Sequence, residues 1–598
     1  MLIPNERKDV MRSVCGIIGE ASPGALRRME AEMKGNVARS ERPGAVLCST
    51  EHKPQELRLG ENHWVLCYRG RLRNGDELRW ELMQENHMLV ETTDEELVIH
   101  AFAQWGQECV LHLRGSFAFA LWDEARKRLF LARDPMGAET LFYTDVDGSF
   151  RFASELKILL ADPAVPAEID ECGIAELLLL GPGRTPGCAV LRGISELEPG
   201  CSALFERGKL TKKRYWKLLD GAHSLDFPQT AELIRETVTK AIRSQCSPEC
   251  GCFLSGGLDS GIVCAVTAES REVPIETFSV DYEGNDRYFT PGKFQPSADS
   301  DYMGLLESAL GVHAHHVVLT PEELESGMEE VTLARGFPGM GDVDVSLLQF
   351  AKQIRKSVPV ILSGECADEL FGGYPWYSDP ELRNFDGFPW ARSTQQRLAL
   401  LRPGLIPAEC AESYLRSRYE QTLAESDILP DTDPAERRIR QMMNLNLRWF
   451  MQTLLERNRA AGNAADLEIR SPFCDEELAG LLYWIPWEMK THGGEEKGLL
   501  RQAFADLLPD EILHRKKSPY PKTHDPRFLR RMQSRMEALL GDSAAPIWQI
   551  VSPEAVRAFS RQEPDWPFYG QLMRLPQTLC YLLQLDFWLR HYRVSVRR

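Results

Sequence analysis

Two short polar segments, at residues 255–260 and 363–374, carry the residues best suited to phosphate chemistry. The first, Ser255-Gly-Gly-Leu-Asp-Ser260, follows an apolar run and precedes Gly261-Ile-Val-Cys-Ala-Val266, which is typical of a helix start. Glycines let the backbone approach a ligand closely, serines donate hydrogen bonds, and a helix N-terminus attracts anions. This segment therefore predicts a phosphate-binding loop. It lacks the Gly-Lys-Ser/Thr ending of a Walker A sequence, so a kinase or ATPase of that kind is not indicated.

The elements around these segments predict how they are positioned. Three apolar runs, at residues 252–254, 275–278 and 358–362, are separated by stretches with helical spacing, which indicates a parallel sheet of βαβ units. Each run ends in small or acidic residues, at 255–260, 279–281 and 363–369. Ligands of open α/β sheets gather outside the carboxyl ends of the strands. We therefore expect the three polar loops to share one crevice.

The residue pattern changes twice along the chain. Up to about residue 218, short alternating segments broken by Asp-Gly and Pro-Gly turns predict a largely β domain. From about residue 226, apolar residues recur at helical spacing with Thr230 as the expected N-cap, which predicts the start of an α/β domain. From about residue 380, Leu, Arg and Trp at helical spacing predict a helical extension of that domain.

Composition limits the classes of function. A chain of 598 residues is too long for one hydrophobic core, and its 43% hydrophobic and 26% charged residues are typical of folded globular proteins. The formal charge of −18 disfavours nucleic acid as a partner. The first residues are charged and no apolar run reaches membrane-spanning length, so we expect no membrane partner and a cytoplasmic location. The 15 cysteines are then expected to be reduced thiols.

Three cysteines lie close enough in sequence to suggest a zinc site. Cys246, Cys250 and Cys252 have no convincing fourth ligand, and the segment around Cys252 leads directly into the glycine loop. Free cysteine packs well in buried strands. We therefore expect these residues to begin a buried strand.

Both polar segments resemble signatures of known enzymes. Residues 255–260 resemble the pyrophosphate-binding loop of N-type ATP pyrophosphatases, and residues 363–374 (Ser-Gly-Glu-Cys-Ala-Asp-Glu-Leu-Phe-Gly-Gly-Tyr) resemble the second signature of asparagine synthetases. Arg470-Ser-Pro-Phe-Cys-Asp475 and Glu496-Lys-Gly-Leu-Leu-Arg501 extend the likeness, which covers nearly the whole chain from Cys15 onward. The chain is therefore similar to the asparagine synthetase family.

This resemblance implies a fold and an activity. It implies an α/β protein with an N-terminal α+β sandwich at residues 15–218, similar to the Ntn-hydrolase-like domain of class II glutamine amidotransferases. A doubly wound parallel-sheet adenylating domain with a helical C-terminal extension would follow at residues 226–598. The activity implied is that of an AMP-forming, ATP-dependent carbon–nitrogen ligase of asparagine biosynthesis that uses Mg²⁺. A homodimer is also implied.

The resemblance also assigns roles to individual residues. Asp259 and Asp368 resemble the carboxylates that hold magnesium, an ion that takes one or two carboxylates together with phosphate oxygens. Lys497 resembles the lysine that neutralises charge on the α-phosphate as pyrophosphate departs. The adenine and phosphate groups of ATP are assigned to Leu254, Ser255, Gly256, Gly257, Asp259, Ser260, Val280, Ser363 and Gly364.

Glu365 separates two branches of the family. In asparagine synthetases its counterpart assists at the acyl-adenylate stage and is a candidate base for incoming ammonia. The related β-lactam synthetases have a tyrosine there, so Glu365 favours amidation over ring closure. A structural carboxylate that caps the helix beginning at Cys366 is the alternative.

The N-terminal half departs from the family in its nucleophile. Cys15-Gly-Ile-Ile-Gly19 resembles the start of class II glutamine amidotransferases, whose catalytic cysteine must be the first residue because its own α-amine acts as the base. Fourteen residues precede Cys15 here. Cys15 would be a nucleophile only if a leader ending at Val14 were removed.

The glutamine pocket departs as well. Arg42-Pro-Gly-Ala45 replaces Arg-Gly-Pro-Asp, and Arg69-Gly-Arg71 replaces Asn-Gly-Glu. Two cations cannot receive the ammonium group of glutamine. Asp94 alone of the glutamine-binding residues persists. We therefore predict that this domain keeps its fold and has lost glutaminase activity.

These observations define a leading function and three alternatives. We expect a ligase that adenylates a carboxylate, foremost aspartate as β-aspartyl-AMP, and amidates it with free ammonia to give an amide, AMP and pyrophosphate. Arg459-Ala-Ala-Gly-Asn-Ala464, where the family resembles Asp-Arg-Met-Ser-Met-Ala, leaves another carboxylic acid open as the acceptor. The alternatives are a glutamine-hydrolysing asparagine synthetase with a processed N-terminus, a natural-product amide ligase or cyclase, and a non-catalytic pseudoenzyme.

Overall fold

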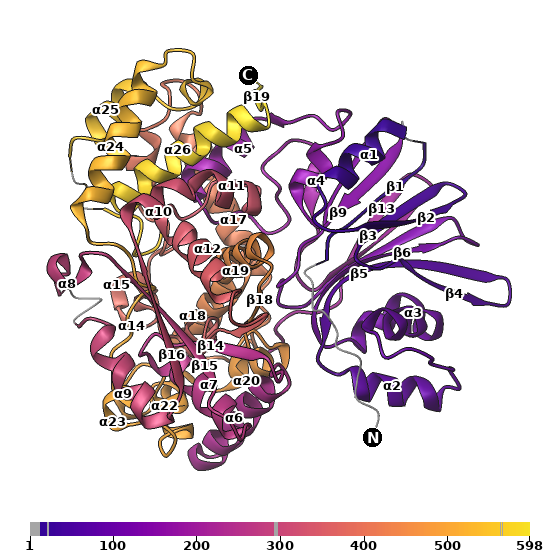
Figure 1. The fold of residues 1–598 in the computed structure, drawn as a ribbon, viewed down its shortest axis with the longest axis horizontal. Coiled ribbons are helices and arrows are strands. Elements are labelled where there is room, and N and C mark those ends of the chain that lie inside the picture. Colours follow the sequence, from indigo (N-terminus) through magenta and orange to yellow (C-terminus); the bar gives the residue numbers. More distant parts are fainter. Residues whose placement is uncertain (1–11, 21–22, 292–296, 563, 565, 598) are drawn as a thin grey trace.

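Two bodies of secondary structure lie side by side in the computed structural model, and both contain β-sheet (Figure 1). The structure describes residues 12–20, 23–291, 297–562, 564 and 566–597. In Figure 1 the indigo and purple N-terminal body is dominated by strands, and the magenta to yellow body is dominated by helices.

The N-terminal body contains two six-stranded antiparallel sheets. Their strand orders are β11-β8-β9-β1-β3-β2 and β13-β12-β7-β6-β5-β4. The strands span β1 (Val14–Ile18), β2 (Val37–Arg42), β3 (Ala45–Thr50), β4 (Gln55–Leu59), β5 (Asn62–Leu72), β6 (Gly115–Asp123), β7 (Arg128–Arg133), β8 (Phe142–Val146), β9 (Ser149–Ala153), β11 (Ile194–Glu196), β12 (Cys201–Glu206) and β13 (Lys209–Arg214).

Strand β6 shows why the two sheets stack. Ala118, Ala120 and Trp122 join the core between the sheets, whereas Phe117 and Phe119 face the opposite side. Successive side chains of a strand alternate between its faces, and both faces of β6 are apolar, so both must be covered. Helices α2 (Gly75–Gln84) and α3 (Asp94–Trp105) pack on one outer face, and α1 (Pro23–Ala31) and α4 (Leu156–Leu160) pack on the other (Figure 1). The predicted α+β sandwich is confirmed.

The second body is built on a five-stranded parallel sheet. Its order is β16-β15-β14-β17-β18, with β14 (Cys250–Phe253), β15 (Glu276–Tyr282), β16 (His313–Leu319), β17 (Val360–Leu362) and β18 (Glu468–Arg470). All neighbours pair in parallel. The chain winds outward first to β16 and then, from β17, in the other direction, so the strand order reverses between β14 and β17. This is the doubly wound arrangement that was predicted.

Helices cover both faces of this sheet. Helices α6 (Phe227–Arg243) and α7 (Leu258–Glu269) contribute to one core, while α12 (Asp342–Ile354) and α19 (Met451–Ala465) contribute to the core on the other face. Cys250 and Cys252 lie buried in β14, as expected, whereas Cys246 is half-buried and lies between α6 and β14. The predicted N-cap at Thr230 is wrong, because Asp226 caps α6 in a capping box with Gln229.

The C-terminal extension is helical, as predicted, and it closes one end of the molecule. Helices α24 (Pro526–Gly541) and α26 (Leu575–His591) pack together (Figure 1). After α26 the chain forms β19 (Ser595–Val596), which pairs in parallel with β10 (Glu168–Ile169). Within the described residues, no helix combines the length and apolar character needed to cross a membrane.

Ion pairs and hydrogen bonds join the two bodies. Arg73 in the N-terminal body contacts Asp475 and Glu476 at the start of α20 (Glu476–Trp484). Lys34 pairs with Asp466 just after α19, at 2.7 Å. The parallel-sheet body is therefore held against the sandwich along the C-terminal part of α19 and the start of α20.

Candidate active site

A cavity of about 210 Å³ lies at the carboxyl ends of β14, β15 and β17. It flanks the point where the strand order reverses, which is where open α/β sheets bind ligands. The three polar loops therefore share one crevice, as predicted. The cavity lining includes the following residues singled out from the sequence: Leu254, Ser255, Gly257, Asp259, Ser260, Val280, Ser363, Gly364, Glu365, Asp368 and Lys497.

The loop before α7 has the backbone of an anion cradle. Gly256 has a φ of +71°, and a Cβ there would lie 2.9 Å from Cβ of Tyr302. The hydroxyls of Ser255 and Ser260 lie 2.9 Å apart, and the Ser260 hydroxyl donates to the carbonyl of Gly257. The twelve-residue helix α7 starts at the next residue. Its free N–H groups and dipole favour phosphate at this position.

Gly364 brings the two signature segments into contact. A Cβ at this position would lie 2.7 Å from the backbone nitrogen of Ser260 and 2.9 Å from the carbonyl carbon of Asp259. Only glycine allows this approach. The carboxylates carried by the two segments are consequently held in one place.

Four charged side chains meet where these segments touch. Nζ of Lys497 lies 2.8 and 2.7 Å from the two carboxylate oxygens of Asp259, and it also contacts Asp368. Nζ of Lys517 lies 2.5 Å from Oδ2 of Asp368. Lys497 precedes α22 (Gly498–Ala503) in a left-handed conformation, with a φ of 57°. Lys497 and Asp368 are buried, Asp259 and Lys517 are half-buried, and the cluster carries two positive and two negative charges.

The lysines control the charge of the two carboxylates. Burial raises the pKa of Asp259, and the ammonium of Lys497 offsets only part of this effect. Burial acts on Asp368 in the same direction, but Lys497 and Lys517 outweigh it and hold the Asp368 pKa at about 2. Asp368 is therefore ionised at every physiological pH.

The donor set fits a magnesium ion that arrives with a nucleotide. Asp259 and Asp368 contact the same ammonium group, so their carboxylates are close enough to bind one cation together. Oδ1 of Asp368 contacts Lys497 and Oδ2 contacts Lys517, so both oxygens already face cationic groups. Two carboxylates complemented by phosphate oxygens and water are the ligands that Mg²⁺ usually takes.

Glu365 is held by α19 and not by the helix that follows it. Its two carboxylate oxygens accept hydrogen bonds from Arg457 and Asn458. No side chain caps the helix at Cys366, which has a φ of 77°. The carboxylate therefore faces the cavity region lined by α19, where a second substrate would meet the nucleotide.

Aromatic side chains form the wall beyond Glu365. Tyr374 and Trp376 stack at 4.5 Å, and the ring of Phe450 lies edge-on at 5.1 Å from each. The Tyr374 hydroxyl donates to Glu369 at 2.7 Å, and the other carboxylate oxygen of Glu369 has no partner among the described residues. Burial raises the pKa of Glu369 to about 7. This half of the cavity combines an apolar wall with a titratable carboxyl group.

Three residues of the site were missed in the sequence: Lys517, Glu369 and Arg457. Glu369 lies within the second signature beside Asp368, so its position was a usable signal. Lys517 follows Lys516 in a loop without regular structure, and Arg457 is one of several arginines at helical spacing. Neither pattern distinguishes a site residue from an exposed cation.

Cys15 is fully buried as the second residue of β1. The strands on either side, β3 and β9, pair with it at Cys48 and Ala153. Its thiol lies 3.4 Å from the sulfur of Met33. Cys15 thus contributes an amide nitrogen within a central strand in this structure.

The residues before Cys15 continue this strand arrangement. The amide of Ser13 donates to the Thr50 side chain at 2.8 Å, and the amide of Val14 donates to the Ser154 side chain at 3.1 Å. The Val14 carbonyl accepts from the amide of Ser154 at 2.8 Å. This segment is fixed on both sides, so the backbone continues through the place where a terminal amine would otherwise lie.

Arg69 fills the neighbouring space. Its guanidinium lies 2.5 Å from Oε2 of Glu139, and it donates to the carbonyl of Arg12 and to Oδ1 of Asn463. Asp94, the persisting member of the expected glutamine pocket, accepts from the amide of Leu72 at 2.9 Å. Arg69 is therefore a buried, paired cation that links the N-terminal segment to α19.

Comparison with known proteins decides the family. The family model described as asparagine synthase matches residues 229–590, which is more than half of the chain. The chain belongs to the asparagine synthase family. It is accordingly an ATP-dependent carbon–nitrogen ligase, and the resemblance read from its signatures is confirmed. A model of the glutamine amidotransferase domain matches residues 30–216, which begin after Cys15.

Relatives of this asparagine synthase-family chain carry consistent names. Asparagine synthetase (glutamine-hydrolysing) 3 of Bacillus subtilis is 39% identical, with 89% of this chain and 88% of that protein covered. Asparagine synthetase (glutamine-hydrolysing) of Gallus gallus is 27% identical, with 76% and 71% covered. A solved glutamine phosphoribosylpyrophosphate amidotransferase from B. subtilis matches with 12% identity and a TM-score of 0.26, covering 59% of this chain and 81% of that one. A score this low adds nothing to the argument.

Proposed function

We propose that this family member adenylates a carboxylic acid with Mg²⁺-ATP and amidates it with free ammonia, with aspartate as the first candidate acid. The carboxylate attacks the α-phosphorus of ATP, which forms the acyl-adenylate and releases pyrophosphate. Ammonia then attacks the acyl carbon, which gives the amide, AMP and a proton. The adenylating half of this proposal is supported by the cradle before α7 and by the lysine–carboxylate cluster.

The residues of the cavity suit these two steps. Ser255, Ser260 and the N-terminus of α7 would bind phosphate oxygens, and Asp259 and Asp368 would hold a Mg²⁺ ion, which supplies positive charge against the phosphates. Lys497 then faces the departing pyrophosphate, and positioned charge of this kind supplies much of the catalysis of phosphoryl transfer. Glu365 accepts the proton from ammonia at the second step.

The nitrogen donor is inferred from the N-terminal half. The observation that carries it is the continuous backbone through Cys15, with Ser13 and Val14 fixed to Thr50 and Ser154. An N-terminal cysteine nucleophile needs a free α-amine as its base. With residues 12–14 in place this amine is an amide, and Arg69 occupies the adjoining space. Glutamine hydrolysis, which the names of the relatives state for those proteins, is therefore not proposed here.

The test compares nitrogen donors. Pyrophosphate release is measured with ATP, Mg²⁺ and aspartate, using either ammonium or glutamine, with Asp259→Ala as the blank. We expect turnover with ammonium, and no glutamate release from glutamine. Glutamate release that is lost in Cys15→Ala would overturn the proposal, and mass spectrometry of the N-terminus would then show whether residues 1–14 are removed.

The aromatic wall favours a second candidate acceptor. Tyr374, Trp376 and Phe450 offer an apolar surface beside Glu365, which a small polar acid such as aspartate does not need. An acid with an aromatic or aliphatic group would cover this surface. Exchange of radioactive pyrophosphate into ATP, run with aspartate and with a panel of apolar acids, separates the two acceptors. Exchange with aspartate alone would exclude the second.

A further inference from the structure

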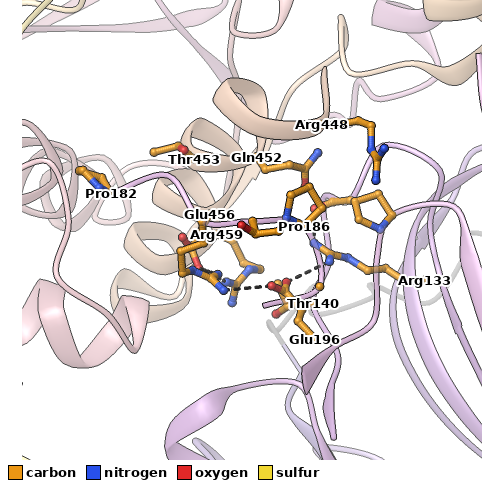
Figure 2. Close-up of a pocket in the computed structure, with 15 residues that line it drawn as sticks. Arg133, Thr140, Pro182, Pro186, Glu196, Arg448, Gln452, Thr453, Glu456 and Arg459 are labelled. Carbon is orange, nitrogen blue, oxygen red and sulfur yellow. Dashed lines mark hydrogen bonds and ion pairs between the residues drawn. The ribbon is translucent and has the colours of Figure 1, made fainter. Parts of the chain in front are cut away.

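A second cavity, of about 30 Å³, lies between the two bodies of the molecule (Figure 2). One side is formed by residues of the N-terminal body, from β7 and the loop after it and from β11 and its flanking loops, and the other by η3 (Asn446–Phe450) and α19. Arginines are its most frequent residue type. The charged lining residues are Arg133, Arg184, Glu196, Arg448, Glu456 and Arg459.

Arg133 is fully partnered by the protein. Arg133 lies 2.9 Å from Oε1 of Glu196 and donates to the carbonyls of Glu139, Leu197 and Gly137. Figure 2 shows Arg133 and Glu196 facing the residues of α19 across the cavity. Glu196 is therefore already paired with Arg133, an arginine of the same N-terminal body.

Arg184 and Arg448 are also neutralised. Arg184 lies 3.2 Å from Oε2 of Glu196 and contacts Glu456. Arg448, at the cavity mouth, pairs with Glu198 at 3.1 Å and contacts Glu425. Each guanidinium therefore contacts two carboxylates, although Nε of Arg184 has no hydrogen-bond partner among the described residues.

Glu456 is shared with a further arginine behind the cavity. Its Oε2 lies 2.9 Å from Arg335, which also pairs with Asp344 at 2.7 Å. Burial opposes ionisation of Glu456, but Arg184 and Arg335 outweigh it and lower the Glu456 pKa. Both oxygens of this carboxylate are committed to arginines other than Arg459.

Arg459 is the cation left with the weakest partner. It is 6% exposed, and its nearest carboxylate oxygen, Oε1 of Glu456, lies 3.9 Å away. Its Nε and Nη2 have no hydrogen-bond partner among the described residues. Arg69, which also faces Arg459, is itself paired with Glu139. Burial lowers the pKa of Arg459, as expected for a cation with incomplete compensation.

Among the cations around the cavity, Arg459 lacks a close counter-charge. Arg133, Arg184 and Arg335 each lie within 3.2 Å of a carboxylate oxygen, whereas the shortest such distance for Arg459 is 3.9 Å. A buried charge without a counter-charge is strongly unfavourable, so such groups are normally paired. A volume of about 30 Å³ exceeds the ~10–15 Å³ that one water molecule needs.

We propose that this inter-domain cavity is a binding site for one small monovalent anion, held by Nε and Nη2 of Arg459. The chemistry is that of a halide or of the carboxylate of a small acid, since both present one negative charge and only acceptor atoms. Larger anions exceed the space. The anion would bridge α19 and the sandwich, and it lies on the face of α19 away from Glu365.

Thermal unfolding tests the site without any assay of catalysis. Sodium gluconate, a bulky anion, is replaced stepwise by chloride, formate or acetate at constant ionic strength. Because a ligand that binds only the folded state stabilises it, we expect a saturable rise in Tm of a few degrees. A rise with chloride alone indicates a halide site, and a rise with formate or acetate indicates a carboxylate site. An equal Tm in gluconate and in all three anions overturns the proposal.

Matched variants locate the effect. Arg459→Met removes the charge and keeps the length, so its Tm should not depend on the anion, and it should unfold at a higher Tm than the wild type in gluconate. Arg448→Met removes an arginine of the same cavity that already has partners, so it should keep the anion dependence. Retained dependence in Arg459→Met contradicts the assignment. If that variant does not fold, broadening of the chloride-35 resonance by the wild-type protein, reversed by formate, provides the readout, and absence of broadening together with no formate effect on Tm rejects the site.

Discussion

One ammonium group, that of Lys497, lies against the carboxylates of both Asp259 and Asp368. In the proposed function the two carboxylates would hold Mg²⁺, and the lysine would then be available to the phosphate oxygens. In this structure the lysine offsets the charge of the carboxylates, and with nucleotide bound the metal and the lysine would offset the charge of ATP.

Replacing Lys497 by methionine should stop adenylation. We expect the rate of pyrophosphate release to fall by about 10²–10³-fold, as for other losses of a group aimed at developing charge. Lys516→Met is the matched control, because Lys516 borders the same cavity but is exposed. The measurement is a stopped assay of pyrophosphate release. A Lys497→Met rate within a factor of two of the wild-type rate would contradict a role of Lys497 in adenylation.

Glu369 should make stability depend on pH. Burial raises its pKa to about 7, above the unfolded value, so the native state holds the proton more tightly and stability falls as the pH rises between about 4.5 and 7. Glu369→Gln removes this titration. Relative to wild type, its free energy of unfolding should increase by about 2–3 kcal/mol from pH 5 to pH 8.

Denaturant unfolding at the two pH values measures this difference. The control is Glu381→Gln, since the Glu381 side chain is 87% exposed. An identical pH dependence in wild type and Glu369→Gln would show that Glu369 ionises at its ordinary pKa.

The residue types of the site could be predicted from sequence, but their pairing could not. The loop at 255–260 and the acidic segment at 363–369 can be recognised in the sequence, because each is a run of small or acidic residues that follows an apolar strand. Lys517 and Arg457 do not, because each acquires its partner, Asp368 or Glu365, only through the fold. The long side chains of lysine and arginine reach many places from one backbone position, so spacing carries little information about them.

At the scale of elements, the site depends on how closely two loops approach. The loop before α7 and the loop after β17 touch at Gly364, and neighbouring parallel strands β14 and β17 fix their spacing. The backbone, more than any side chain, sets the distance between the two carboxylates.

Gly364→Ala should separate these loops. Its methyl group would lie 2.7 Å from the nitrogen of Ser260, so we expect a destabilisation of about 1–3 kcal/mol and a large loss of pyrophosphate release. The comparison is Gly480→Ala within α20, where nothing lies within 4 Å of the added carbon. That change should stabilise the protein by about 0.5–1 kcal/mol. Equal effects of the two variants on thermal unfolding would contradict the proposed close approach.

Elements were predictable where burial leaves an apolar pattern. β14, β15 and β17 were identified because they are apolar runs, and the sandwich was indicated by alternation. β16 was missed because it is an edge strand that begins His313-Ala-His-His316 and is largely exposed, and β18 because three residues after a long helix carry no periodicity. The N-cap of α6 was predicted four residues too late, at Thr230 in place of Asp226, because both Thr and Asp are common N-cap residues.

At the scale of the whole molecule, charged contacts hold the sandwich against the parallel-sheet body. Arg73 reaches Asp475 and Glu476, and Arg69 reaches Asn463. None of these pairs is readable from the sequence, because the partners are separated by about 400 positions. The family resemblance predicted the two bodies, whereas the contacts between them could be identified only in the structure.

Arg73→Met should weaken the joint between the bodies. It leaves Asp475 and Glu476 buried without their cation, so we expect a loss of about 3–5 kcal/mol. Calorimetry should show two separated transitions in place of one. Lys213→Met removes a pair with Glu108 in which both side chains are more than half exposed, and it should cost at most about 1 kcal/mol. A single, unshifted transition in the Arg73 variant would show that apolar contacts alone hold the bodies together.

The parallel pair of β10 and β19 joins two strands that are synthesised at very different times. The carbonyl of Ala167 accepts from the amide of Ser595, 428 positions later. At a translation rate of ~5–20 residues per second, a nascent chain exposes the edge of β10 for roughly 20–90 s before its partner emerges. Unpaired strand edges can pair with other chains and cause aggregation. Because β10 has only two residues, its exposed edge is short, which limits aggregation during this time. The β10–β19 pair can thus form only after residue 595 has left the ribosome.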